Sequence, residues 1–267
     1  MAQSRATQRR LNTGRSVASV RRAQSLANPT VRTRSGVIAA YFEDGAGRAA
    51  LRIATEGAAL RGASLRLFDD IDAADAAEEL VRRSREVDLL VIGTTGSGSS
   101  DTLRVDAIAR SLSHRADCPV MFVPAGAEQV GITEVVCGVD RSTGSAAALR
   151  WAAREAAMRG GKVLAQQVQP WADAFVEPPT QSLSGWVFAQ EIAEPTTIVC
   201  HLVCGTSPAA ELVHTALERR AMLVVGSHRS DGGQLHRCIA GRLAGRTSVP
   251  LVVVPPVIPA PRKPPGI

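Results

Sequence analysis

Short apolar runs alternate along most of the chain with longer segments in which apolar residues recur at helical spacing. One stretch shows this best: an apolar run over 135–139 predicts a strand, and Asp140 and Ser142 follow as turn and N-cap residues. Helical spacing then continues over 146–158. The same reading predicts strands at 162–168, 197–203, 222–226 and 251–254, and helices at 184–191, 208–219 and 235–246. This alternation predicts an α/β fold with a doubly wound parallel sheet.

The pattern is duplicated. Residues 49–62, 90–93 and 108–124 resemble residues 147–160, 223–226 and 239–255, in that order. The offset between the copies rises from 98 to 133 and then falls to 131, so the second copy holds 35 extra residues between its first two blocks. We therefore expect two tandem domains, the first without its third strand and the segment before that strand. The predicted parts are a disordered basic tail (1–35), a truncated domain (36–126), a complete domain (133–256) and a Pro-rich tail (257–267).

Charge separates the N-terminal tail from the rest of the chain. Residues 1–35 contain eight Arg and no Asp or Glu, which leaves 23 of the 31 basic residues against 25 acidic ones elsewhere. This composition predicts a solvated tail, and an organelle transit peptide or a nucleic-acid-binding arm is the alternative. Contact with nucleic acid or an anionic membrane is therefore expected only through the tail. With 3% aromatic residues, the body is a poor stacking platform for bases.

Cysteine usage bears on the compartment and on metal binding. The chain has five Cys, an odd number, and no signal-peptide pattern, which favours a reducing cytoplasm. Cys200 and Cys204 stand about 13 Å apart along a predicted strand, too far to share a zinc ion or a disulfide. No apolar run approaches the roughly 20 residues of a membrane-spanning helix, so no transmembrane segment is expected.

Taken together, several segments resemble the universal stress protein family. In the second copy they are 135–142, 223–227 and 249–254, and in the first copy 89–93 and 114–120. The resemblance implies parallel sheets of strand order 3-2-1-4-5. The strand missing from the first domain would then be an edge strand, so its loss leaves the other strands paired. The resemblance also implies an intramolecular pseudo-dimer paired through the last strands, 119–123 and 250–254, and allows a homodimer.

Nucleotide-binding members of that family carry an Asp at the end of strand one and a loop G-x2-G-x9-G-[ST] after strand four. Glycines let backbone N–H groups approach the phosphates, and the next helix N-terminus adds positive charge. The second copy departs from this loop, since Arg229 replaces the second glycine and Arg237 and Cys238 replace Gly-Ser. The site assigned to ATP or AMP is Asp140, Ser142, Val203, Gly226, His228, Arg229, Gly232, Gly233, Arg237 and Cys238.

The first copy is expected to bind no nucleotide. Its loop keeps Gly93 and Gly96 but has Asp106 and Ala107 in place of Gly-Ser. A carboxylate about 4 Å from a phosphate charge would cost on the order of 4 kcal/mol at an effective dielectric constant near 20. Phe42 is aligned with the strand-one Asp, and the missing third strand removes a wall of the adenine pocket.

No catalytic or metal-binding residue is predicted. The chain lacks G-x4-G-K-[ST], H-E-x2-H and G-x-S-x-G motifs, and His114, His214 and His236 fall on helices or their approaches without a catalytic partner. The favoured interpretation is a non-enzymatic stress-response or signalling protein whose second domain binds ATP or AMP weakly. One alternative is an interaction protein that binds no nucleotide. A less favoured one is an adenine-nucleotide enzyme such as an ATPase.

Overall fold

The computed structural model describes residues 36–41, 47–72, 74–94, 102–129, 132–170, 182–227, 239–244 and 247–256. The first domain comprises β1 (Val37–Tyr41), α1 (Gly47–Arg61), β2 (Ser64–Leu67), α2 (Ala76–Arg83), β3 (Leu89–Thr94), α3 (Thr102–Arg115) and β4 (Val120–Pro124). A 3-10 helix η1 (Ala125–Gln129) leads to the second domain. That domain comprises β5 (Glu134–Gly138), α4 (Thr143–Met158), β6 (Lys162–Pro170), α5 (Leu183–Phe188), β7 (Thr197–Gly205), α6 (Pro208–Glu218), β8 (Met222–Gly226), α7 (Ile239–Leu243) and β9 (Leu251–Val254).

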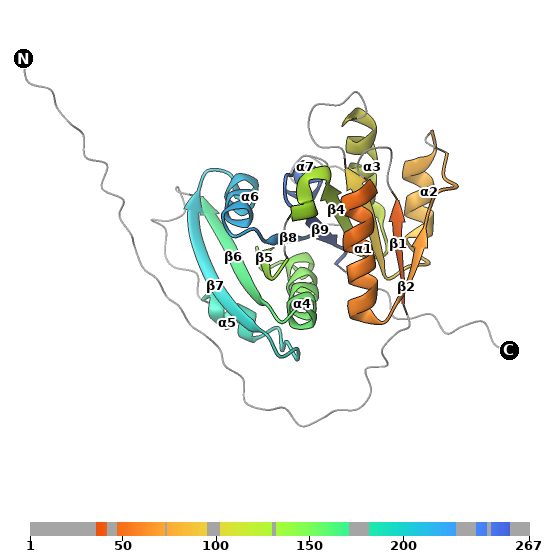
Figure 1. Ribbon diagram of the computed structural model, residues 1–267. Helices are drawn as coiled ribbons and strands as arrows, with labels where there is room; N and C mark the ends of the chain where they lie inside the picture. Colours follow the sequence, from red (N-terminus) through yellow and green to blue (C-terminus); the bar gives the residue numbers. More distant parts are fainter. Residues whose placement is uncertain are drawn as a thin grey trace, which may run out of the picture.

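All the described strands join one sheet in the order β2-β1-β3-β4-β9-β8-β5-β6-β7 (Figure 1). The second domain therefore has the predicted order 3-2-1-4-5, and the described first domain has the same order without its third strand. Every pairing is parallel except that of β4 with β9, which is antiparallel and sets Met121 opposite Val252. The prediction that the last strands of the two domains pair with each other is confirmed.

Helices cover both faces of this sheet, as its apolar strands require. The four central strands β3, β4, β9 and β8 are buried along almost their whole length. Residues of α1, α4 and α5 form one core cluster with one face of the sheet, and residues of α2, α3, α6 and α7 form another on the opposite face. The sheet ends at β2 and at β7, which are the more exposed strands.

A buried cluster of charges joins the two domains between α1 and α4. Arg61 pairs with Glu155, whose side chain is fully buried, and Nη1 of Arg159 lies 2.7 Å from Oε1 of Glu56. Nε of Arg159 also donates to Glu155 at 2.7 Å. Arg61 and Arg159 are separated by the repeat offset of 98 and are therefore equivalent positions. Each of the two pairs with a glutamate of the other domain.

The elements differ from the sequence-based expectations chiefly at their ends. Strands β6 and β7 run two residues further than predicted, because they pair with each other along nine positions. Helix α4 begins at Thr143, where the Ser142 hydroxyl accepts a hydrogen bond from the Ser145 amide. Ser207 caps α6 in the same way, one residue before the predicted start of that helix. Of the helix expected over 235–246, the described part is Ile239–Leu243. Both predicted tails lie outside the described residues.

Candidate functional site

A cavity of about 140 Å³ opens in the second domain at the carboxyl ends of β5, β6 and β8. Strand β5 is the strand at which the chain direction across the sheet reverses, with β6 on one side and β8 on the other. Ligands of open α/β sheets bind at this kind of topological switch point. The lining residues are Gly138, Val139, Asp140, Ser142, Ser145, Gln166, Val168, Pro208, Leu212, Val225, Gly226 and Ile239.

Asp140 organises the loop at the mouth of the cavity. Its Oδ1 accepts hydrogen bonds from the Ser142 amide at 3.0 Å and from the Ser142 hydroxyl at 2.5 Å. The same hydroxyl accepts from the Ser145 amide at 3.1 Å and so caps α4. Arg141, between Asp140 and Ser142, has a φ of 66°, a conformation that side-chain-bearing residues rarely adopt. The exposed Asp140 carboxylate is therefore held in place by local hydrogen bonds.

Two glycines allow neighbouring elements to come close enough to form the cavity. A Cβ atom on Gly226 would lie 2.3 Å from the carbonyl carbon of Gly144, because the end of β8 approaches the backbone of α4 directly. On Gly138 it would lie 2.8 Å from a methyl carbon of Leu212, a side chain that can move. Gly226 is thus fixed by a backbone contact. Gly138 instead leaves space beside a flexible side chain.

Gln166 is the buried polar residue of the cavity wall. It is fully buried on β6, and its Nε2 donates to the carbonyl oxygen of Glu211 at 3.4 Å. Its Oε1 has no hydrogen-bond partner among the described residues. The nearby wall formed by Val168, Leu212 and Val225 is apolar. An acceptor in such surroundings is costly unless a donor reaches it.

The structure brings together only part of the predicted site. Asp140, Ser142 and Gly226 line the cavity, whereas Val203 does not. Val203 lies on β7 beside Val168, and it is Val168 that faces the cavity. The other predicted residues of the second domain, which are His228, Arg229, Gly232, Gly233, Arg237 and Cys238, lie outside the described residues.

Sequence reasoning missed most of the wall, namely Gly138, Val139, Ser145, Gln166, Val168, Pro208, Leu212, Val225 and Ile239. The family motif consists of the strand-one Asp and the loop after strand four. It therefore predicts no site residue on strand two or on α6. One signal was available: Gln166 and Gln167 are adjacent polar residues that directly follow the apolar run 163–165 of the same strand.

The strand register shows what the first domain has at the equivalent positions. Ile38 pairs with Leu89 as Val135 pairs with Met222, so Tyr41 corresponds to Gly138. Pairing with the second strand likewise makes Phe68 the counterpart of Gln166. Tyr41 and Phe68 are 6% and 4% exposed, respectively, and both belong to the core cluster on that face. Buried aromatic rings therefore stand at the positions where the second domain leaves its cavity open.

The same register bears on one alignment. Two positions beyond Gly138 is Asp140, and two positions beyond Tyr41 is Glu43, so counting from the paired strands places Glu43, one residue after Phe42, opposite Asp140. The repeat offset changes from 97 in these strands to 98 in the helices that follow. Both residues lie outside the described part. The alignment of Phe42 with the strand-one Asp therefore stays a prediction.

Little of the predicted first-domain loop can be placed. Gly93 lies on β3, and Gly96 falls outside the described residues. Asp106 and Ala107 lie on α3, where Ala107 is exposed and the side chain of Asp106 is outside the described part. The expected repulsion between Asp106 and a phosphate stays a prediction.

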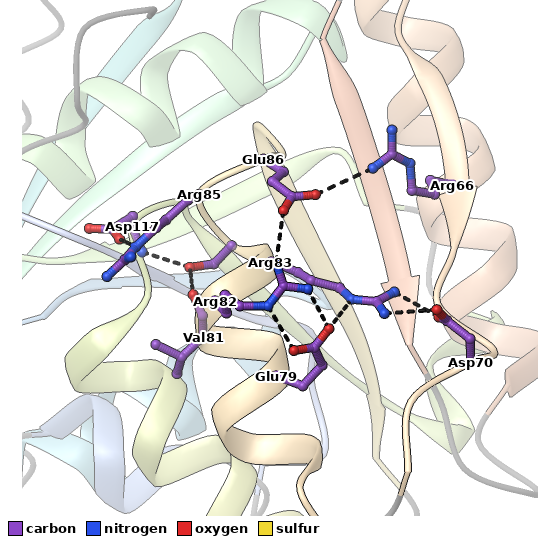
Figure 2. A network of polar contacts seen from close by, with 10 residues as sticks. Arg66, Asp70, Glu79, Val81, Arg82, Arg83, Arg85, Glu86 and Asp117 are labelled. Atoms are coloured by element: carbon purple, nitrogen blue, oxygen red, sulfur yellow. Dashed lines mark hydrogen bonds and ion pairs between the residues drawn. The ribbon is translucent and has the colours of Figure 1, made fainter.

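A network of ion pairs in the first domain joins Arg82 and Arg83 to Glu79 and Asp70 (Figure 2). Arg83 donates to both oxygens of Asp70, at 2.7 and 2.8 Å, and to Glu79 at 2.6 Å. The Arg83 guanidinium also lies 4.8 Å from the centre of the Phe68 ring. Hydrogen bonds from Arg82 and Arg83 lower the pKa of Glu79 to about 2. This network ties α2 to the segment that follows β2.

The remaining chemically reactive side chains form no second site in the described part. No group of three metal-ligating side chains is found among those residues. Burial raises the pKa of the Cys118 and Cys137 thiols, and Cys200 and Cys204 are free on β7.

His114 lies on α3, and His214 on α6 pairs with Glu218 across 3.2 Å at the surface. His236 lies outside the described residues. None of the described helices is long and apolar enough to cross a membrane.

Fold and cavity together define a tandem α/β protein with a small cavity at the switch point of its second domain. Residues 9–124 and 131–255 match the sequence model of the Universal stress protein family, and the chain belongs to this family. Universal stress protein Rv2623 of Mycobacterium tuberculosis is 28% identical to it over 215 residues, which cover 74% of this chain and 71% of the relative.

Two solved structures share the fold. A universal stress protein from Archaeoglobus fulgidus superimposes with a TM-score of 0.54 at 15% identity, covering 78% of this chain and 77% of that one. A putative universal stress protein from Pseudomonas aeruginosa gives 0.53 at 14% identity, covering 84% and 94%. These likenesses bear on the architecture alone.

Proposed function

We propose that this universal stress protein is a non-enzymatic stress-response or signalling protein of the cytoplasm that binds one adenine nucleotide, ATP or AMP, weakly in its second domain. The observation that carries the proposal is the switch-point cavity lined by Asp140 and Gly226. In the first domain, Tyr41 and Phe68 fill the corresponding positions. The antiparallel pairing of β4 with β9 supports an intramolecular pseudo-dimer, and a homodimer would need a further surface.

The size of the cavity suits part of a nucleotide. Its volume of about 140 Å³ is below the roughly 300–1,000 Å³ of pockets that enclose drug-sized ligands. The described walls would therefore hold the base and part of the ribose. The phosphates would extend toward the segment that carries Arg229 and Arg237, where positive charge would replace the missing loop glycines.

One observation favours a second candidate, an interaction protein without nucleotide. Among the lining residues that the structure describes, Asp140 is the sole ionisable one, and it is an acid. A carboxylate does not attract phosphates, so nucleotide affinity depends on residues beyond the described wall. The same observation argues against an enzyme, because acid–base catalysis needs suitably placed proton donors and acceptors.

Calorimetric titration with ATP and AMP tests the proposal, together with mass spectrometry of small molecules released by heat denaturation. We expect one site per chain, and a loss of affinity of roughly tenfold or more in Asp140→Ala, the size of a strong polar contact. Asp72→Ala is the matched control, because Asp72 accepts from the Ala74 amide at 3.0 Å in a similar turn of the first domain. Absence of binding at millimolar nucleotide would favour the interaction protein.

A further inference from the structure

The buried Oε1 atom of Gln166 calls for a hydrogen-bond donor. Buried polar side-chain atoms nearly always have a partner, and this atom has none among the described residues. The amide is held from the other side, since Nε2 donates to the Glu211 carbonyl at 3.4 Å. The backbone carbonyl oxygen of Gln166 accepts a hydrogen bond from the Val139 amide at 2.9 Å. Both its backbone and its amide nitrogen are thus engaged, while its side-chain oxygen is left over in the cavity wall.

The other polar groups of the described wall cannot supply that donor. The Ser142 hydroxyl donates to Asp140 at 2.5 Å, and the Ser145 hydroxyl donates to the Ser142 carbonyl at 3.0 Å. The Asp140 carboxylate is itself an acceptor. The described cavity therefore offers a ligand mainly acceptors, Asp140 at the mouth and Gln166 inside. A ligand that fits this wall brings donors of its own.

We infer that Gln166 selects the base of the bound nucleotide, its Oε1 accepting a hydrogen bond from the exocyclic amine of a 6-aminopurine. The inference rests on the proposed function and specifies the ligand class. Adenine carries a donor at its 6-position, whereas hypoxanthine and guanine carry a carbonyl oxygen there. A 6-oxo purine in the same pose would set two acceptor oxygens against each other and leave Gln166 unpaired, which disfavours it.

Two positions in the same chain serve as internal references. Phe68, the counterpart of Gln166 in the first domain, has a ring where the amide would be and packs beneath Arg83. Gln167 is the next residue on β6 and also has an unpaired buried Oε1, but it does not line the cavity. Successive side chains of a strand point to opposite faces of the sheet, so Gln167 controls for the loss of an amide on β6 without a change in the cavity.

The experiment compares three ligands that differ at one ring position. Titrations use AMP, IMP and purine riboside 5′-monophosphate, which has a hydrogen in place of the 6-amine. Full-length wild-type protein should bind AMP at least about tenfold more tightly than either analogue, the size of one hydrogen bond to a buried acceptor. Gln166→Met keeps the length of the side chain and removes the acceptor, and it should bring the three affinities within about twofold. Gln167→Met should keep the wild-type preference.

The outcomes separate the two proposals. Equal wild-type affinities for the three ligands, or a preference for AMP that survives Gln166→Met, would overturn the role of Gln166 while nucleotide binding stands. Equal wild-type affinities would overturn the role of Gln166 even if the variant does not fold. If Gln166→Met and Gln167→Met lower all affinities equally, Gln166 is structural. If the wild type binds none of the ligands at millimolar concentration, the proposed function and the role of Gln166 both fail.

Discussion

The two domains build the same sheet and differ where their first two strands end. In the first domain, Tyr41 and Phe68 are buried there as part of the core. In the second domain, the equivalent positions are Gly138 and Gln166, and a cavity opens between the strands and α6. The doubly wound fold accepts either solution, because the strand pairing is the same in both. A ligand site is therefore a local property of a few side chains and does not follow from the fold.

The missing third strand sharpens this contrast. Strand β6 is paired on both sides and extends over nine residues, whereas β2 is an edge strand of four. After β2, the chain of the first domain continues into a segment whose Asp70 pairs with Arg83 of α2. Ion pairs anchor α2 to that segment (Figure 2). The Arg83 guanidinium also lies over the ring of Phe68. The first domain thus fills with packed side chains the space that remains a cavity in the second domain.

The largest effect is expected from breaking the charge cluster between the domains. Glu155→Gln would leave Arg61 and Arg159 without their buried partner. Removing one member of a buried ion pair costs roughly 3–5 kcal/mol, so the free energy of unfolding should fall by about that amount. Urea denaturation followed by circular dichroism measures it. Because the cluster contains residues of both domains, the loss should appear in one cooperative transition.

Glu78→Gln is the control for that experiment, since Glu78 pairs with Arg115 at the surface of the first domain. It should leave the unfolding midpoint close to that of the wild type. Two separate transitions in the wild type, or a Glu155→Gln effect confined to one of them, would show that the domains do not behave as a unit.

A smaller effect on stability, with a large effect on binding, is expected from filling the cavity of the second domain. A methyl group on Gly138 would press on Leu212, whose side chain can shift, so Gly138→Ala should cost about 1–3 kcal/mol. The same methyl group fills part of the cavity, at the position that Tyr41 fills in the first domain. The affinity for AMP should therefore fall at least about tenfold. Gly126→Ala has open space around its added methyl group and should change neither quantity.

The smallest effect concerns acid sensitivity and belongs to the first domain. The pKa of Glu79 is lowered from 4.5 to about 2 by its hydrogen bonds with Arg82 and Arg83. A carboxyl group whose pKa is lower in the folded protein stabilises the fold above its unfolded pKa. That contribution is lost as the pH falls from about 4.5 toward about 2. Urea midpoints of the wild type and Glu79→Gln should therefore converge at the acid end of this range. A constant difference at every pH would contradict the assignment.

Elements with strong local signals could be predicted from the sequence. The strand over 222–226 and the strand over 251–254 are apolar and central, and the structure places them as predicted. Ser142 and Ser207 mark helix starts through their side-chain chemistry, and both cap helices. The order of the strands and the pairing of the last two came from the family resemblance, since local patterns carry no information on which strands become neighbours.

The cavity could be predicted only in part, for physical reasons. Asp140 and Gly226 stand in motifs, but Gln166 becomes a site residue only because β6 pairs beside β5 and α6 covers it. The alignment of Phe42 with Asp140 likewise depends on a loop that lies beyond the paired residues of β1. Register is set by pairing across the sheet, and single-chain patterns do not reveal it.

Photoaffinity labelling with 8-azido-AMP tests whether the second domain alone holds the nucleotide site. Irradiated protein is digested, and the labelled peptides are identified by mass spectrometry, with and without excess AMP. We predict at most one label per chain, suppressed by AMP and confined to peptides from residues 138–168 or 208–227. AMP-sensitive labelling of the peptides that carry Tyr41 or Phe68, or two labels per chain, would contradict a single site in the second domain.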